Sequence, residues 1–234
     1  MVKRIMLAAV CVFLCTFVNA GDAAAFVDLG FSKDGCVYMF AQHGSTDKLW
    51  QGFAEIYSVD IEKNDYIHSG CFKTSASAQT EGINGSTVYE KLFEKNKAYI
   101  RAVSPEPADL KHTLYIKNLN KEALEEIVFT DFEGSTEENP VFFHIRLIPW
   151  FSGKTASSKS SFFISVERKD KNGTLLSKHV AGNPDIKRTG VTDYTIEKIM
   201  RSPDNKSLIF AVEKKLTSST GVSVRYMTEA LRLK

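Results

Sequence analysis

Short runs of apolar residues, separated by turn-forming residues, recur along most of the chain. Residues 53–61 (FAEIYSVDI) alternate in character, so that Phe53, Tyr57 and Val59 fall on one side of an extended strand. Comparable runs lie at residues 26–31, 36–41 and 66–73. The pattern predicts four antiparallel strands that follow one another as a meander.

One segment has a helical period instead. Between residues 88 and 103, apolar side chains recur at spacings of three and four. Thr87 and Glu90 stand three residues apart and fit a capping box at the start of a helix. The sequence therefore predicts one amphipathic helix over about residues 87–103, with its apolar stripe facing the core.

Strand-like runs return after residue 113 and continue toward the end of the chain. Asn172-Gly173 lies between two of them and is the strongest two-residue hairpin motif present. Residues 202–205 (SPDN) form another turn between apolar segments. We expect a mainly β fold of antiparallel meanders that resemble propeller blades, arranged either as a partial propeller or as a β-sandwich.

The two ends of the chain repeat one unit. Residues 32–35 (SKDG) align without gaps on residues 202–205 (SPDN), and similar apolar runs follow both. An aspartate side chain accepts hydrogen bonds from turn amides, and glycine or asparagine tolerates a left-handed backbone. We therefore interpret four residues as structural turn residues: Asp34, Gly35, Asp204 and Asn205.

This unit resembles the blade motif of TolB-type β-propellers, in which an S-P-D-G turn joins the first two strands of a blade. The whole mature chain resembles an uncharacterised family of bacterial predicted secreted proteins, a domain of unknown function. The resemblance rests on FVDLGFSKDG, AEIYSVDI, RTGVTDYTIEKI and VRYMTEALRL. It implies export and a single mainly β domain over residues 21–234, and it implies no activity.

Residues 1–20 have the pattern of a secretory signal peptide. Two positive charges precede an apolar run over residues 5–18, and Ala20 supplies a small residue at the cleavage site. The run is too short to span a bilayer. Phe13-Leu14 stands where a lipidation motif has small residues, which argues against a lipid anchor at Cys15. We expect a secreted or periplasmic protein with no transmembrane segment after signal removal.

Charge argues against a nucleic-acid partner. The chain has 30 Lys+Arg and 28 Asp+Glu residues, and loss of Lys3 and Arg4 with the signal leaves 28 of each. No basic stripe is present in the sequence that would displace counterions from phosphates. We therefore expect a partner other than nucleic acid.

Cys36 and Cys71 are the two cysteines of the mature chain. Export favours a disulfide between them. The predicted strands place them two strands apart, about 10 Å across the sheet, and at opposite ends of it. A disulfide requires Cα atoms within about 7 Å. Two buried free thiols are the preferred interpretation, and the disulfide is the alternative.

Motifs that carry chemistry are missing from the sequence. The five histidines have no metal-ligand spacing, and no nucleophile elbow is present. We therefore predict no metal, no cofactor and no catalytic residue.

A guanidinium beside an aromatic ring can hold a carboxylate or phosphate, so the candidates for a ligand site are Arg188, Arg225, Tyr226 and Glu229. The structural alternative is an Arg225–Glu229 network or solvated strand faces.

Export, neutral charge and the missing catalytic motifs favour a non-catalytic module of the envelope or periplasm. Its expected partner is an envelope protein or a glycan. The alternative is a secreted hydrolase whose site is assembled only in three dimensions.

Overall fold

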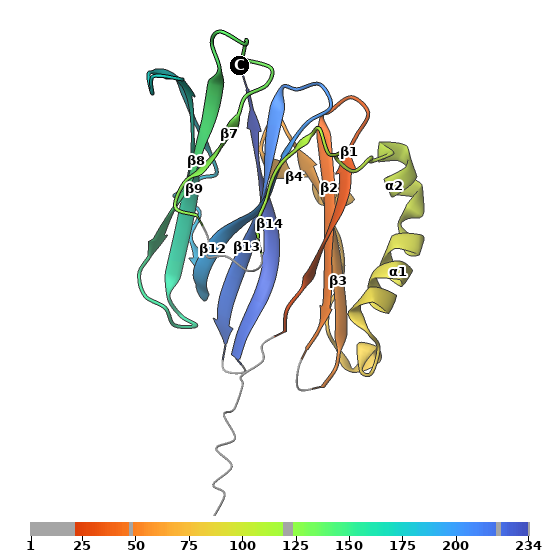
Figure 1. The fold of residues 1–234 in the computed structure, drawn as a ribbon. Coiled ribbons are helices and arrows are strands. Elements are labelled where there is room, and N and C mark those ends of the chain that lie inside the picture. The colour runs from red at the N-terminus through yellow and green to blue at the C-terminus, as the bar shows by residue number, and fades with distance from the viewer. Residues whose placement is uncertain (1–21, 47–48, 119–123, 219–220, 234) are drawn as a thin grey trace, which may run out of the picture.

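Three antiparallel sheets lie one on another, and two α-helices cover one outer face of the stack (Figure 1). The computed structural model describes residues 22–46, 49–118, 124–218 and 221–233. The N-terminal sheet contains β1 (Ala25–Phe31), β2 (Val37–Ser45), β3 (Gly52–Asp60), β4 (Asp65–Tyr66) and β5 (Phe72–Thr74). The central sheet contains β6 (Thr113–Ile116), β12 (Val191–Arg201), β13 (Ser207–Ser218) and β14 (Gly221–Arg232). The outer sheet contains β7 (Ile127–Thr130), β8 (Val141–Phe151), β9 (Lys159–Asp170), β10 (Leu175–Ala181) and β11 (Arg188–Thr189).

The central sheet is buried on both of its faces. On β13, Leu208 and Phe210 belong to the apolar core shared with the outer sheet. Ile209 and Ala211 alternate with them and belong to the core shared with the N-terminal sheet. A strand that is covered on both sides needs apolar residues at every position, which explains the unbroken run over residues 208–212.

The mainly β, antiparallel class predicted from the sequence is confirmed. The stack contains one sheet more than a two-sheet sandwich, and within the described residues the sheets form no closed barrel. The likeness of each sheet to a propeller blade stays a prediction.

The predicted helix is present but is divided in two. α1 (Gly85–Lys95) and α2 (Lys97–Val103) meet at Asn96, which has φ −110° and ψ 11° and is not helical. The predicted capping box was wrong: α1 is capped by Asn84, whose Oδ1 accepts a hydrogen bond of 3.0 Å from the Ser86 amide. Among the described residues, no helix is long and apolar enough to cross a bilayer.

The helices pack on the face of the N-terminal sheet that points away from the stack. Val88, Leu92 and Ile100 share a core with Met39 and Ile56 of the sheet. Each of these residues is at most 5% exposed. The helices therefore cover one end of the stack (Figure 1), whereas the outer sheet ends it on the other side.

The two repeated turns have the same hydrogen bonds. Ser32 Oγ donates to Asp34 Oδ1 at 2.6 Å, and the Cys36 amide donates to the same oxygen at 3.0 Å. Ser202 Oγ donates to Asp204 Oδ1 at 2.5 Å, and the Lys206 amide donates to it at 3.1 Å. The residues that follow the aspartates, at positions 35 and 205, have φ of 68° and 59°, in the left-handed region.

Replacement of Asp34 by alanine is expected to lower the free energy of unfolding by about 1 kcal/mol, because both hydrogen bonds to Oδ1 are lost. Asp34→Asn should lower it less, because the amide oxygen still accepts them. Urea unfolding of both variants measures the difference. If Asp34→Asn abolished ligand binding while the melting temperature stayed unchanged, the structural interpretation of the turn would be wrong.

Cys36 and Cys71 are free thiols in the structure. Cys36 is exposed at the start of β2, and Cys71 is partly buried just before β5. The expectation of two buried thiols was therefore wrong for Cys36. Residue 36 ends the turn before β2, and its Sγ lies 3.7 Å from the carbonyl oxygen of Asp34, on the exposed side of the turn.

Candidate functional site

A polar pocket opens where the edges of the three sheets meet. It has a volume of about 570 Å³. The turn between β3 and β4, the segment between β10 and β11, and strands β13 and β14 form its walls. We call it the three-sheet pocket, and its lining residues are Lys63, Asn64, Asp65, Tyr66, Gly182, Asn183, Ile186, Arg188, Lys214, Met227, Thr228 and Glu229.

Glu229 on β14 is a buried carboxylate of this pocket and is 6% exposed. Asn64 Nδ2 donates a hydrogen bond of 2.6 Å to Glu229 Oε2, and Asn64 Oδ1 accepts one of 2.6 Å from the Ala230 amide. Asn64 has φ of 51°, a conformation that asparagine adopts more readily than most residues. Burial raises the pKa of Glu229, and the Asn64 hydrogen bond and the charge of Arg188 oppose that change.

Arg188 approaches Glu229 from the outer sheet. Its Nη2 lies 3.5 Å from Glu229 Oε1, and its guanidinium carbon lies 5.0 Å from the centroid of the Phe162 ring. The nearby Gly182 has φ of 82°, and a Cβ there would lie 3.3 Å from the carboxylate carbon of Glu229. Glycine therefore allows the loop to pass close to the carboxylate.

Lys214 on β13 has two cations as neighbours. The strand register places it directly opposite Arg225 on β14, and like charges in that relation repel. Burial lowers the pKa of Lys214 to about 8. The charges of Arg188 and Arg225 add to this effect, and the charge of Glu55 opposes it. In the part of the chain that the structure describes, no hydrogen bond or ion pair holds its ammonium group.

Two of the four ligand-site residues predicted from the sequence line the pocket, namely Arg188 and Glu229. Arg225 is held elsewhere: it forms an ion pair with Asp22, and its guanidinium carbon lies 4.1 Å from the centroid of the Phe53 ring. The ion pairs are therefore Arg188–Glu229 and Arg225–Asp22, and the Arg225–Glu229 network considered from the sequence was wrong.

Tyr226 points to the opposite face of β14. Its ring centroid lies 5.3 Å from that of Phe26, and its amide donates a hydrogen bond of 2.8 Å to Gln42 Oε1. Burial raises the pKa of Tyr226 to about 12. Tyr226 therefore packs against the N-terminal sheet and does not line the pocket.

Sequence reasoning missed Lys214 and Asn64. A pattern that could have found Lys214 is the alternation of β13, because Phe210, Val212 and residue 214 share one face. Two apolar residues followed by a lysine on a core-facing side predict a buried charge. No local pattern links Asn64 to Glu229, which is 165 residues away.

The pocket is suited to an anion. Lys63, Arg188 and Lys214 supply three positive charges, and Asp65 and Glu229 supply two negative ones. Arg188 is shared with Glu229, but Lys214 forms no ion pair within the described residues, so its ammonium group can pair with a ligand. Those same residues contain no group of three or more side chains that could hold a metal ion.

A comparison with family models identifies the chain. A model described as predicted secreted protein (DUF2259) matches residues 39–232. The chain belongs to this family. Because the family is a domain of unknown function, it supports secretion and assigns no activity. No curated protein and no solved structure matches the chain.

Proposed function

We propose that this secreted-family protein is a binding module that holds an anionic group of an envelope glycan or protein in the three-sheet pocket. The observation that carries the proposal is Lys214, a half-buried ammonium group that two arginines repel, that only Glu55 opposes with a negative charge, and that has no ion pair or hydrogen bond among the described residues. Repulsion among these cations is relieved when a carboxylate or phosphate enters. Arg188 supplies a guanidinium at the same site.

The cellular location of the protein and the extent of its folded domain are part of the same proposal. Residues 1–20, which lie outside the described residues, act as a signal peptide, and the protein works in the periplasm or outside the cell. Residues 21–234 act as one domain. This is supported by the two apolar cores that join the central sheet to the sheets on either side of it.

The ligand chemistry that fits best is a sugar–peptide fragment with free carboxylates, as in peptidoglycan. A pocket of about 570 Å³ has the size of a small-ligand site. Polar walls favour sugars and peptide amides, and the cations favour the carboxylate. Neutral glycans lack the group that would pair with Lys214.

Lys214→Met is expected to weaken binding of a muropeptide with free carboxylates roughly 10-fold, because one charge-assisted contact is lost. The adjacent Lys215→Met is the matched control, since Lys215 lies on the other face of β13 and pairs with the exposed Asp193. Calorimetric titration of both variants with the muropeptide, and with its amidated form, measures the effect. Equal loss in both variants, or equal affinity for the amidated form, would contradict the proposal.

The pH dependence of the same titration has a defined sign. Lys214 carries its charge below its pKa of about 8 and loses it above that value. Affinity for the carboxylate ligand should therefore fall as the pH rises from 7 to 10 in the wild-type protein. Lys214→Met should show no such fall over this range.

The hydrolase alternative depends on the same pocket. The raised pKa of Glu229 and the lowered pKa of Lys214 are features that a general acid and a general base would need. Turnover of ester, glycoside or phosphoester substrates that disappears in Glu229→Gln would favour the hydrolase. Binding without turnover would favour the module.

A further inference from the structure

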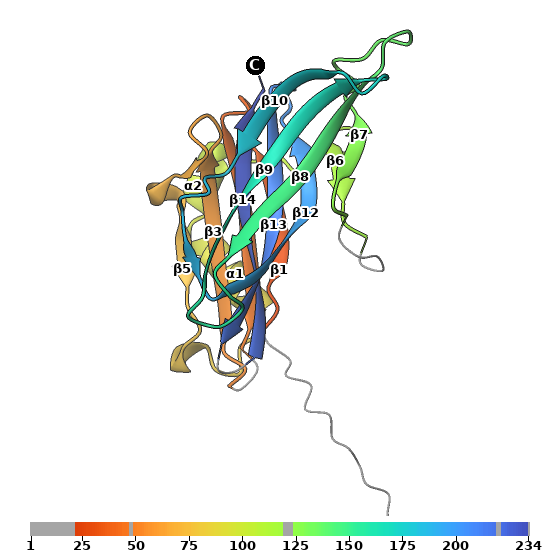
Figure 2. The same ribbon diagram turned by 90° about the vertical axis from the view of Figure 1, so that its left-hand side faces the viewer.

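Two neighbouring cavities lie at another edge of the stack, between the central and outer sheets. β6 and β7 are edge strands of these sheets, and Figure 2 shows them next to each other. The larger cavity has a volume of about 500 Å³ and the smaller one about 250 Å³. Both are lined by Glu133, Arg201 and Asn205, so they lie next to each other. We call the two cavities together the Arg201 cleft.

The larger part of the Arg201 cleft has mixed walls, in which four apolar side chains stand among polar ones such as Lys111 and His112. Leu114 of β6 and Phe129 of β7 line it, together with Leu110 and Phe132 from the neighbouring loops. Leu110 is 92% exposed and Phe132 is 77% exposed. Large apolar side chains that are this exposed and that line one cleft indicate a binding surface for an apolar group.

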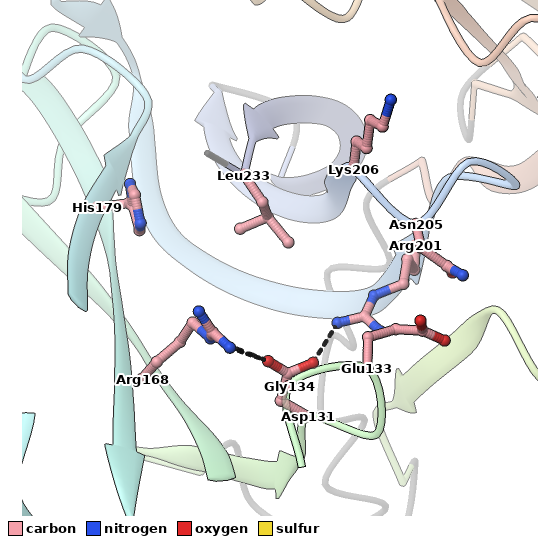
Figure 3. Close-up of a pocket in the computed structure, with 9 residues that line it drawn as sticks. All are labelled: Asp131, Glu133, Gly134, Arg168, His179, Arg201, Asn205, Lys206 and Leu233. Atoms are coloured by element: carbon pink, nitrogen blue, oxygen red, sulfur yellow. Dashed lines mark hydrogen bonds and ion pairs between the residues drawn. The ribbon is translucent and has the colours of Figure 1, made fainter. Parts of the chain in front are cut away.

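The smaller part is rich in positive charge. Figure 3 shows Arg168 and Arg201 on either side of Asp131; His179 and Lys206 line the same cavity, and the Lys206 amino group points away from Asp131. Arg168 and Arg201 both bind Asp131, at 2.7 and 2.8 Å. One carboxylate thus balances two guanidinium groups, and Lys206 adds a further charge. Glu133 lines both cavities and supplies one more negative charge. The smaller cavity is thus lined by three positive and two negative side chains.

Arg201 also has an unfilled hydrogen-bonding position. Its side chain is 6% exposed, and its Nε has no acceptor among the described residues. Buried donors in folded proteins normally have a partner. Nε itself is buried. A ligand oxygen would therefore approach the part of the guanidinium that lines both cavities, where they meet.

We propose that the Arg201 cleft binds a medium-chain acyl carboxylate. The acyl chain lies between Leu114, Phe129 and Phe132, and the carboxylate is held by Arg201 and Lys206. The site is separate from the three-sheet pocket and shares no lining residue with it. A neutral alcohol of the same length would bury the same chain but would leave the cationic end unpaired.

The test is a calorimetric titration of the mature protein with decanoate, kept below its micellar concentration, and with decanol. Decanoate should bind at least about 10-fold more tightly than decanol, since only the acid pairs with the guanidinium. Affinity should also rise several-fold from octanoate to decanoate, because each methylene adds buried apolar area.

Variants at exposed positions keep the test independent of folding. Phe132→Asp should weaken decanoate binding about 10-fold, because it places a negative charge beside the chain. Leu175→Asp is the matched control, because Leu175 is also exposed, at 51%, and does not line the cleft. Lys206→Gln should weaken the binding of decanoate and leave that of decanol unchanged.

Equal affinities for decanoate and decanol, or wild-type affinity in Phe132→Asp or in Lys206→Gln, would overturn the proposal. Lys214→Met should bind decanoate as the wild-type protein does. The outcome at the Arg201 cleft is therefore distinguishable from the outcome at the three-sheet pocket.

Discussion

Replacement of Asp131 by asparagine is expected to lower the free energy of unfolding by about 3–5 kcal/mol, because it leaves two arginines without their shared counter-ion. Asp131 follows β7 and is 3% exposed. Arg168 Nε donates to its Oδ2 at 2.9 Å, and Arg201 Nη2 donates to its Oδ1 at 2.8 Å. These bonds tie the end of β7 to β9 within the outer sheet and to β12 of the central sheet.

Urea unfolding at neutral pH measures this loss. Asp193→Asn is the control, because the Asp193–Lys215 ion pair is exposed and its removal should change stability by less than about 1 kcal/mol. The double variant Asp131→Asn with Arg201→Met should recover part of the stability, since an apolar side chain on the Phe143 ring needs no counter-ion. A loss below about 1 kcal/mol in Asp131→Asn would show that the triad does not hold the sheets together.

Lys214→Met is expected to have the opposite effect and to raise the free energy of unfolding at pH 7 by about 2 kcal/mol. The pKa of Lys214 is about 8 in the folded protein, below its usual value of 10.5. Below pH 8 the folded protein must carry a charge that burial and two arginines disfavour more than Glu55 favours it. Methionine has a similar shape and carries no charge, so the folded state no longer has the free-energy penalty of a buried ammonium group.

The pH dependence separates this mechanism from a general packing effect. Between pH 8 and 10.5 the unfolded wild-type chain binds one proton more than the folded chain at residue 214, so wild-type stability rises with pH. The advantage of Lys214→Met should therefore shrink over that interval. Thermal unfolding should show a gain of roughly 4–8 °C at pH 7. Lys215→Met should show almost none, and a Lys214→Met protein less stable than wild type at pH 7 would refute the mechanism.

The local features of the fold were predictable from the sequence because they depend on neighbours in the chain. The turns at residues 32–35 and 202–205 are specified by Ser, Asp and a residue that tolerates a positive φ. The helical period was visible, but the interruption at Asn96 was not, because an asparagine within an amphipathic segment does not by itself end a helix. The stacking order of the sheets depends on contacts that no local pattern encodes.

The candidate site was predictable only in part, because it too depends on contacts between residues that are far apart in the chain. Arg188 and Glu229 were identified as charges that a ligand could use, and the structure places them 3.5 Å apart. Strand alternation put Arg225 on the same face as Glu229. Arg225 nevertheless pairs with Asp22, because the N-terminal segment runs beside β14 and offers it a carboxylate. That neighbour is about 200 residues away in the chain, so the sequence pattern carried no sign of it.

The position of the central sheet also determines the order in which the protein can fold. The chain is synthesised from its N-terminus, and β12, β13 and β14 are made last, yet they supply the surface that covers both other sheets. Until residue 191 and those after it have emerged, the apolar faces around Phe40 and Phe143 have nothing to pack against. A nascent chain of this protein therefore exposes two apolar faces at once, and such faces favour aggregation and binding by chaperones. The fold can be completed only when the three C-terminal strands β12, β13 and β14 pack between the other two sheets.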